Sequence, residues 1–158
     1  MINLIGTYEG KADAKLRLLL PAPLKKQLAS VMQDGFVMKR SVHEQCLEVY
    51  AMAEWNLLMN EISSINRFIK KNNDFIRIFT AGIKIVELDS AGRLLIPKDL
   101  QAYAGISKEI VLAASGNVIE IWDKDKYEES INVSSDEFSA LTEDVMGGNN
   151  KRNVDGIS

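Results

Sequence analysis

The stretch that decides the fold is VELDSAGRLLIP, residues 86–97. Its first three residues, preceded by Lys84 and Ile85, alternate and contain β-branched side chains, which is typical of a strand. The DSAG sequence that follows predicts a tight turn, because its aspartate can accept hydrogen bonds from backbone amides and its glycine tolerates positive φ. Arg93 to Ile96 predict a second strand, mostly apolar and therefore expected to be buried on both faces. Pro97 cannot extend that strand and is suited to open a helix.

The residues after this stretch complete one structural unit. A short helix is predicted over 98–104, with Gly105 ending it. Residues 109–113 and 118–122 predict a hairpin around the SGN sequence at 115–117. The unit is therefore strand, turn, strand, short helix, strand, strand.

The same pattern occurs earlier in the chain. DAKLRLLLPAPL at 13–24 aligns with DSAGRLLIPKDL at 89–100, and LEVY at 47–50 aligns with IEIW at 119–122. The Asp, Arg, apolar triplet and Pro coincide, so two diverged copies of one unit are predicted. Each copy is too small to bury a good core alone, and we expect the two to pack together.

Helical segments are predicted between and after the copies. Apolar residues from Trp55 to Ile69, at spacings of three and four, predict a connecting amphipathic helix over 53–74. Its apolar face is either core or a partner-binding surface. Residues 75–79 alternate and are interpreted as a strand. A last helix is expected from Ser134, which with Glu137 forms a capping box, to about Met146. The domain prediction is a first unit at 1–52, a connecting helix at 53–74, a second unit at 75–130, a C-terminal helix at 131–146 and a disordered tail at 147–158.

Charge is distributed unevenly along the chain. The net charge is −3, but residues 1–40 hold seven basic and three acidic side chains, whereas residues 84–158 hold eight basic and fourteen acidic ones. One end could therefore face phosphate while the other could not. No apolar run reaches the roughly 20 residues of a membrane span. The single cysteine permits no internal disulfide, the first residues carry no export signal, and a cytoplasmic location is expected.

The paired Asp-x-x-x-Arg turns, each followed by an apolar triplet and a proline, resemble the signature of the MraZ family, bacterial transcriptional regulators within the AbrB-like, swapped-hairpin class of DNA-binding proteins. The resemblance runs from about Leu4 to Glu129. It implies a mainly β, α+β fold in which two tandem units pack as a pseudo-twofold double-split β-barrel with flanking helices. One position departs from the pattern: Leu16 stands where glycine is expected, and a leucine at positive φ would cost about 1–2 kcal/mol. Either the first turn has a different shape, or the first copy presents its arginine differently.

The resemblance also implies a function. Members repress or regulate their own division and cell-wall gene cluster, bind direct repeats of double-stranded DNA upstream of it, associate with the nucleoid and assemble as ring-shaped homo-oligomers. No membrane and no small-molecule substrate is implied as a partner. The alternative that the acidic C-terminal third leaves open is an oligomeric protein-interaction scaffold or an antitoxin-like protein.

The candidate DNA-binding residues are Lys11, Lys15, Arg17 and Arg93. A guanidinium suits bidentate bonding to phosphate or to the edge of guanine, and lysines beside a turn can meet phosphates. Asp13 and Asp89 are interpreted as supports that hold each arginine in one rotamer. The alternative is that each Asp and Arg merely close their turn, and that the lysines are solvated surface charges.

Enzyme chemistry has little support in the sequence. His43 and Cys46 lie three residues apart, but no second His or Cys completes a metal or catalytic site. No phosphate-binding loop, dinucleotide fingerprint or zinc-protease motif occurs. We expect no enzyme, no cofactor and no metal.

Overall fold

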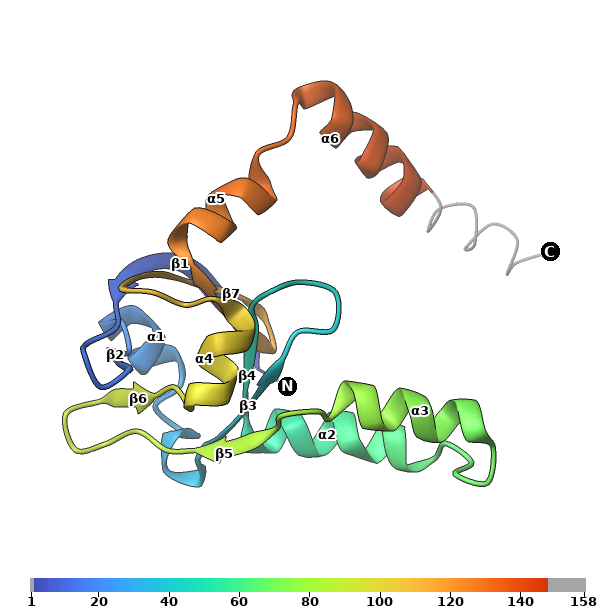
Figure 1. Cartoon of the computed structure of the whole chain (residues 1–158), viewed down its shortest axis with the longest axis horizontal. Coiled ribbons are helices and arrows are strands. Elements are labelled where there is room, and N and C mark those ends of the chain that lie inside the picture. The colour runs from blue at the N-terminus through green and yellow to red at the C-terminus, as the bar shows by residue number, and fades with distance from the viewer. Residues whose placement is uncertain (1, 148–158) are drawn as a thin grey trace. The chain divides into compact units, whose positions relative to one another are not determined.

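Alternating and β-branched segments of both copies form strands that are arranged in two sheets. In the computed structural model, which describes residues 2–147, six strands form one antiparallel sheet in the order β1-β7-β8-β4-β3-β5 (Figure 1). Strands β2 and β6 form a separate two-stranded sheet. The strands are β1 Leu4–Lys11, β2 Arg17–Leu19, β3 Phe36–Arg40, β4 Leu47–Ala51, β5 Lys84–Val86, β6 Arg93–Leu95, β7 Glu109–Gly116 and β8 Val118–Asp123.

Helices follow the strands in both copies. They are α1 Ala22–Gln27, α2 Met52–Ser63, α3 Lys70–Phe79, α4 Lys98–Ala104, α5 Lys124–Ile131 and α6 Ser135–Thr142, with a 3-10 turn at Met32–Asp34 and a π-helical turn at Glu143–Gly147. The chain divides into two compact units, residues 1–127 and 128–158. Within residues 2–147, no helix combines the length and the apolar character that a membrane crossing requires.

The two copies exchange strands. β1 of the first copy pairs with β7 of the second along its whole length, β5 of the second pairs with β3 of the first, and β2 pairs with β6. Neither copy therefore completes its own sheet. The two copies pack together, as expected, by interleaving their strands.

One continuous core joins the halves. Leu18 and Leu94 lie opposite each other in the β2–β6 pair and are fully buried. They contact a cluster that spans both copies and includes Leu24, Phe36, Leu47, Leu100, Ile110 and Ile121. The burial of matching residues from each copy confirms the duplication as a structural one.

Several expectations need correction. The large sheet is open, with β1 and β5 at its edges, and is not a closed barrel. Leu19 and Leu95 are 61% and 54% exposed, so the second strand of each turn is buried on one face only, not on both.

The predicted strand at 75–79 is wrong, because these residues belong to helix α3. The helical conformation lets Asp74 pair with Lys70 and Arg77 on adjacent turns, and lets the Phe75 and Phe79 rings stack 5.7 Å apart. The single helix expected from Trp55 onward is likewise two helices, interrupted at residues 64–69.

At the C-terminal end, the cap is confirmed, and the helix from Ser135 continues through the π-helical turn to Gly147, close to the expected end near Met146. The Ser134 hydroxyl accepts a hydrogen bond from the Glu137 amide at 3.1 Å, as a helix N-cap does. Helix α5, which begins at Lys124, was not predicted. The tail expected to be disordered lies, from residue 148 onward, outside the described residues.

Candidate nucleic-acid interface

The first Asp-x-x-x-Arg turn is closed by one carboxylate. Oδ1 of Asp13 accepts hydrogen bonds from the backbone amides of Lys15 and Arg17, both at 2.9 Å. Oδ2 accepts a hydrogen bond from Nε of Arg17 at 2.8 Å. The Leu16 amide donates to the Asp13 carbonyl at 2.9 Å. Backbone and side chain are thus fixed by the same residue.

The second turn repeats this arrangement. Asp89 accepts from the amides of Ala91 and Arg93 at 2.9 Å, and from Nε of Arg93 at 2.9 Å. The Gly92 amide donates to the Asp89 carbonyl at 3.0 Å. Two distant sequence segments therefore present an arginine in the same way.

The residue before each arginine has positive φ, 63° at Leu16 and 80° at Gly92. The leucine at position 16 therefore changes neither the shape of the first turn nor the way its arginine is held, so both alternatives given from the sequence are wrong. A leucine in this conformation costs about 1–2 kcal/mol.

Both turn aspartates are held in their charged form. Hydrogen bonds from the backbone lower the pKa of Asp13 and of Asp89 below the ordinary value, with the amide of the following arginine as the largest contribution. Burial opposes this effect only in part, and the arginine side chain adds to it. Each arginine consequently faces a carboxylate over the neutral pH range.

The β2–β6 sheet gathers both arginines on one face. Arg17 lies opposite Leu95 and Leu19 lies opposite Arg93. Because side chains alternate across a strand, these four residues share the face away from the buried Leu18–Leu94 pair. Diagonal neighbours in an antiparallel pair are about 7–8 Å apart, so the two arginines are close enough to meet one ligand. We call these four residues the ribbon face.

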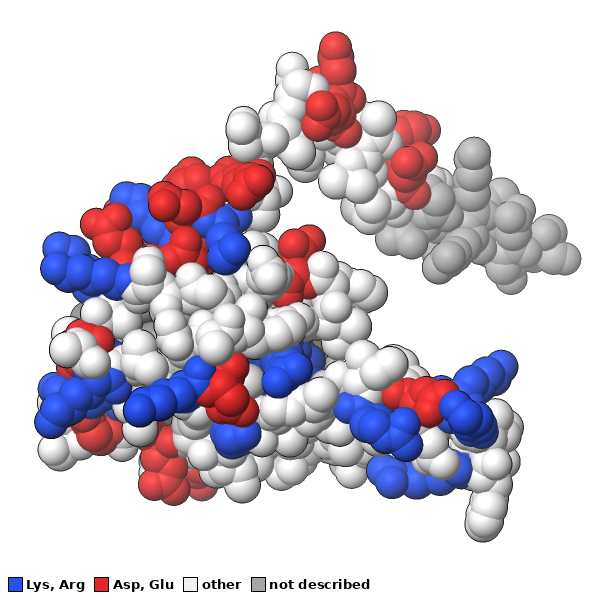
Figure 2. All heavy atoms as spheres, viewed as in Figure 1, with Lys and Arg blue, Asp and Glu red and all other residues white. Residues whose placement is uncertain are grey.

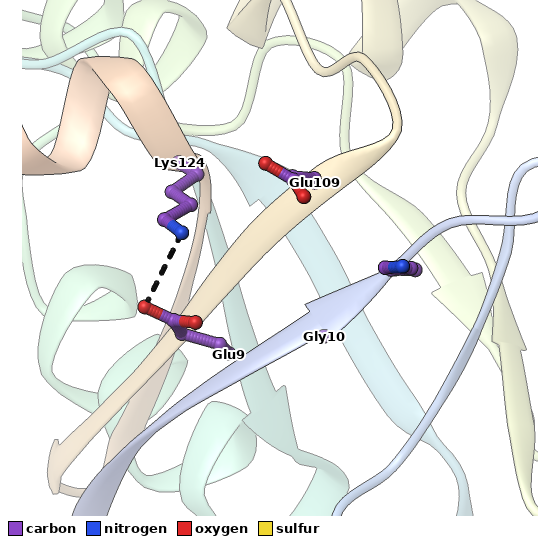
Figure 3. Close-up of a pocket in the computed structure, with 5 residues that line it drawn as sticks. Glu9, Gly10, Glu109 and Lys124 are labelled. Carbon is purple, nitrogen blue, oxygen red and sulfur yellow. Dashed lines mark ion pairs between the residues drawn. The ribbon is translucent and has the colours of Figure 1, made fainter.

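The predicted lysines are in different surroundings. Lys15 is exposed at the tip of the first turn. Lys11 lies opposite Glu109 in the β1–β7 pair and lines a cavity of about 140 Å³ with Glu9, Glu109 and Lys124. Figure 3 shows the Glu9 and Lys124 side chains pointing toward each other across that cavity, 3.6 Å apart. The two glutamates weaken the local positive potential around Lys11.

Two cations near the turns were not singled out from the sequence. A Cβ at Gly92 would lie 2.9 Å from Nζ of Lys25, so that ammonium group covers the second turn. Lys108 is exposed and lines a cavity beside the first turn with Asp13 and Leu16. Lys25 belongs to the first copy and lies at the turn of the second, whereas Lys108 belongs to the second copy and lies beside the turn of the first. Only the three-dimensional structure brings these lysines to the turns.

Two basic residues counted in the positive segment are engaged within the protein. Lys39 is fully buried, pairs with Glu48 at 3.2 Å and lies 4.4 Å from the centre of the Phe79 ring. The Arg40 guanidinium stacks on Tyr103 at 4.9 Å. The positive charge near the first turn is therefore smaller than the sequence count indicates.

The His43–Cys46 pair does not form a reactive site. Cys46 is buried, and burial raises the pKa of its thiol to about 12, which keeps it protonated. His43 is exposed. Among residues 2–147, no group of three or more His, Cys, Asp or Glu side chains could hold a metal ion.

These features define a class: chains built from two interleaved copies of one β-unit, each with an arginine fixed by an aspartate in a tight turn. The sequence profile described as "MraZ protein, putative antitoxin-like" matches residues 4–78 and again 79–148. The chain belongs to the MraZ family.

Similar proteins include three named "Transcriptional regulator MraZ". That of Christiangramia forsetii is 63% identical over the full length of both chains. That of Flavobacterium psychrophilum is 58% identical over 95% of this chain and 96% of its own, and that of Cytophaga hutchinsonii is 38% identical over 92% and 96%.

Proposed function

We propose that this chain is a sequence-specific, DNA-binding transcriptional regulator that represses its own division and cell-wall gene cluster. The names of its relatives support regulation of transcription. The observation that carries DNA binding is the ribbon face, where two arginines are presented by matching turns on a two-stranded antiparallel sheet.

The ribbon face suits the major groove. That groove admits a two-stranded β-ribbon, and a guanidinium can bond to both O6 and N7 of guanine. Nε of Arg17 and of Arg93 is engaged by an aspartate, and among the described residues the structure shows no bond from their terminal amines. Those amines are the groups that would meet a base or phosphate. Exposed Leu19 and Leu95 between them can contact thymine methyl groups.

Phosphate contacts would come from lysines at the turns. Lys15 is the best placed, and Lys25 and Lys108 add positive charge at either turn. Lys11 would contribute less because of Glu9 and Glu109. Such contacts position a protein on DNA without reading its sequence.

A single ribbon face offers few contacts, so self-assembly is part of the proposal. A ring of copies would present the face repeatedly to direct repeats, and linked weak contacts add avidity. The strand exchange between the copies fits the swapped-hairpin arrangement of AbrB-like proteins, with the two halves replacing a homodimer. We place the protein in the cytoplasm on the nucleoid and expect no catalytic activity.

The test is fluorescence anisotropy with labelled double-stranded DNA from upstream of the gene. Arg17→Ala and Arg93→Ala should each weaken binding about tenfold or more, since one bidentate base contact contributes about 1–3 kcal/mol. The control Lys84→Ala removes an exposed lysine of β5 that pairs with Asp99, outside the ribbon face, and should leave affinity within about twofold. Equal affinity of wild type and both ribbon variants would refute the assignment of the ribbon face.

A second candidate, an antitoxin-like or scaffold protein, is favoured by the exposed apolar side chains of residues 128–147. Its mark would be a different protein that co-purifies at a fixed ratio, together with the absence of DNA binding by the full chain.

A further inference from the structure

The second unit carries an unusual combination of charge and exposed apolar surface. Residues 128–147 contain six acidic side chains and no basic one (Figure 2). Phe138, Leu141 and Val145 follow one another at spacings of three and four, so they form one stripe along α6 and the π-helical turn after it. All three are more than half exposed. An amphipathic helix with a bare apolar stripe lacks the partner that its pattern requires.

The complementary surface is the outer side of α3 and the segment before it. Phe68 is completely exposed, and Phe75 and Ile78 are about half exposed one helical turn apart. Arg67 and Lys71 beside them are exposed, and among the described residues neither forms an ion pair. The one nearby aspartate on α3, Asp74, is already paired with Lys70 and Arg77. We call this the hairpin surface.

The geometry points to docking of the acidic stripe of one copy onto the hairpin surface of a second copy of this chain. Both surfaces expose apolar side chains in helical register, and their net charges are opposite. Burying the apolar residues would supply the affinity, while the charges would fix the pairing and disfavour stripe-to-stripe contact. The inference rests on the self-assembly in the proposed function and names the surfaces that would produce it.

The two surfaces are different parts of the chain, so the contact would be heterologous. Each copy would then bind one neighbour through its stripe and another through its hairpin surface. Repeated contacts of this kind form a ring if the rotation between neighbouring copies closes on itself. The interface would be separate from the ribbon face, which leaves the arginines available to DNA.

The experiment is light scattering on full-length charge-reversal variants. Arg67→Glu with Lys71→Glu, and separately Glu137→Lys with Asp144→Lys, should each shift the assembly to a smaller species. Mixing the two variants brings the native stripe of one together with the native hairpin surface of the other, and the two reversed surfaces also have opposite charges, so larger species should be recovered. The control Lys26→Glu with Lys98→Glu reverses two exposed lysines elsewhere and should leave the mass unchanged. Circular dichroism of each variant checks that it folds.

Engineered cysteines distinguish contact between chains from folding back within one chain. Phe75→Cys and Leu141→Cys are made in separate chains, and native Cys46 is buried and does not interfere. Oxidation of the mixture should link one chain of each type. A doubly substituted chain that closes on itself in an excess of wild type would overturn the inference.

The outcomes separate the two proposals. A wild-type chain that stays monomeric overturns self-assembly and the docking with it. A wild type that assembles, with both charge-reversal variants equally assembled, overturns the docking alone and leaves DNA binding by the ribbon face intact.

Discussion

Leu16 and Gly92 occupy the same position in two turns that share the same hydrogen bonds, and both have positive φ. The burial of the Leu16 side chain offsets part of this backbone strain, because the side chain is half-buried and packs against the main core cluster. The surrounding bonds to Asp13 hold the conformation. The first copy therefore keeps the turn shape without glycine.

Gly92→Ala should lower the free energy of unfolding by about 1–2 kcal/mol, because alanine at this φ is strained. The added methyl group would meet only the flexible end of Lys25, which can move aside. Urea unfolding followed by circular dichroism measures the loss. Gly10→Ala is the control: its Cβ would make ordinary contact with Ile110 at 3.7 Å, and it should change stability by less than about 0.5 kcal/mol.

Stability should depend on pH through the turn aspartates. Their folded-state pKa values lie below the ordinary 3.8, so the folded state binds fewer protons than the unfolded chain. Their contribution is complete above about pH 5 and is lost as the pH falls through 3.8 toward the folded-state pKa. The double variant Asp13→Asn, Asp89→Asn should flatten this acid-side decline in urea unfolding between pH 5 and pH 3. A decline as steep as that of wild type, or one flattened equally by Asp34→Asn outside the turns, would contradict the prediction.

Removing the buried lysine should be costly. Lys39→Met leaves the Glu48 carboxylate without its cation, and we expect a loss of about 3 kcal/mol. The double variant Lys39→Met, Glu48→Gln should lose less than the sum of the single variants, since it leaves no uncompensated charge. Additive losses in chemical unfolding would mean that the pair is not coupled.

The two neighbouring leucines of β6 should behave differently. Leu94→Ala removes a fully buried side chain and should cost about 2–5 kcal/mol. Leu95→Ala, one residue further on the exposed face, should cost less than about 1 kcal/mol. Leu95→Ala should weaken DNA binding, because Leu95 is part of the ribbon face. Thermal unfolding should therefore show the larger loss for Leu94→Ala, and anisotropy should show weaker DNA binding for Leu95→Ala.

Lysine contacts should be visible in the salt dependence of DNA binding. Lys15→Gln should reduce the slope of log affinity against log salt by about 1, the value for one phosphate contact. Lys11→Gln should change it less, because Glu9 and Glu109 lie beside that lysine. Equal slopes for Lys15→Gln and wild type would show that Lys15 does not contact phosphate.

The sequence was informative where structure is local. The Asp-x-x-x-Arg turn, the helix ended by Gly105 at φ 63° and the β7–β8 hairpin all depend on residues close together in the chain, and each is confirmed. The repeat itself was visible because matching residues kept their spacing.

What the sequence could not show depends on distant contacts. The alternation at 75–79 fits a strand, but in the structure the Phe79 ring stacks on Trp55 of α2 with 6.1 Å between ring centres, a distant contact that favours the helix. Lys39 has the pattern of a surface charge, yet Glu48 on the neighbouring strand and the Phe79 ring allow its burial. Likewise, Lys25 reaches the second turn only because the copies interleave.

The interleaving also governs how the chain can reach its folded state during synthesis. β1 is among the first segments to leave the ribosome, but its partner β7 begins about a hundred residues later. The long first strand must therefore stay unpaired until most of the polypeptide has been made, and closing so distant a pairing slows folding. Fusing two units into one polypeptide shortens that wait compared with finding a separate molecule, and it guarantees that every first half meets a second.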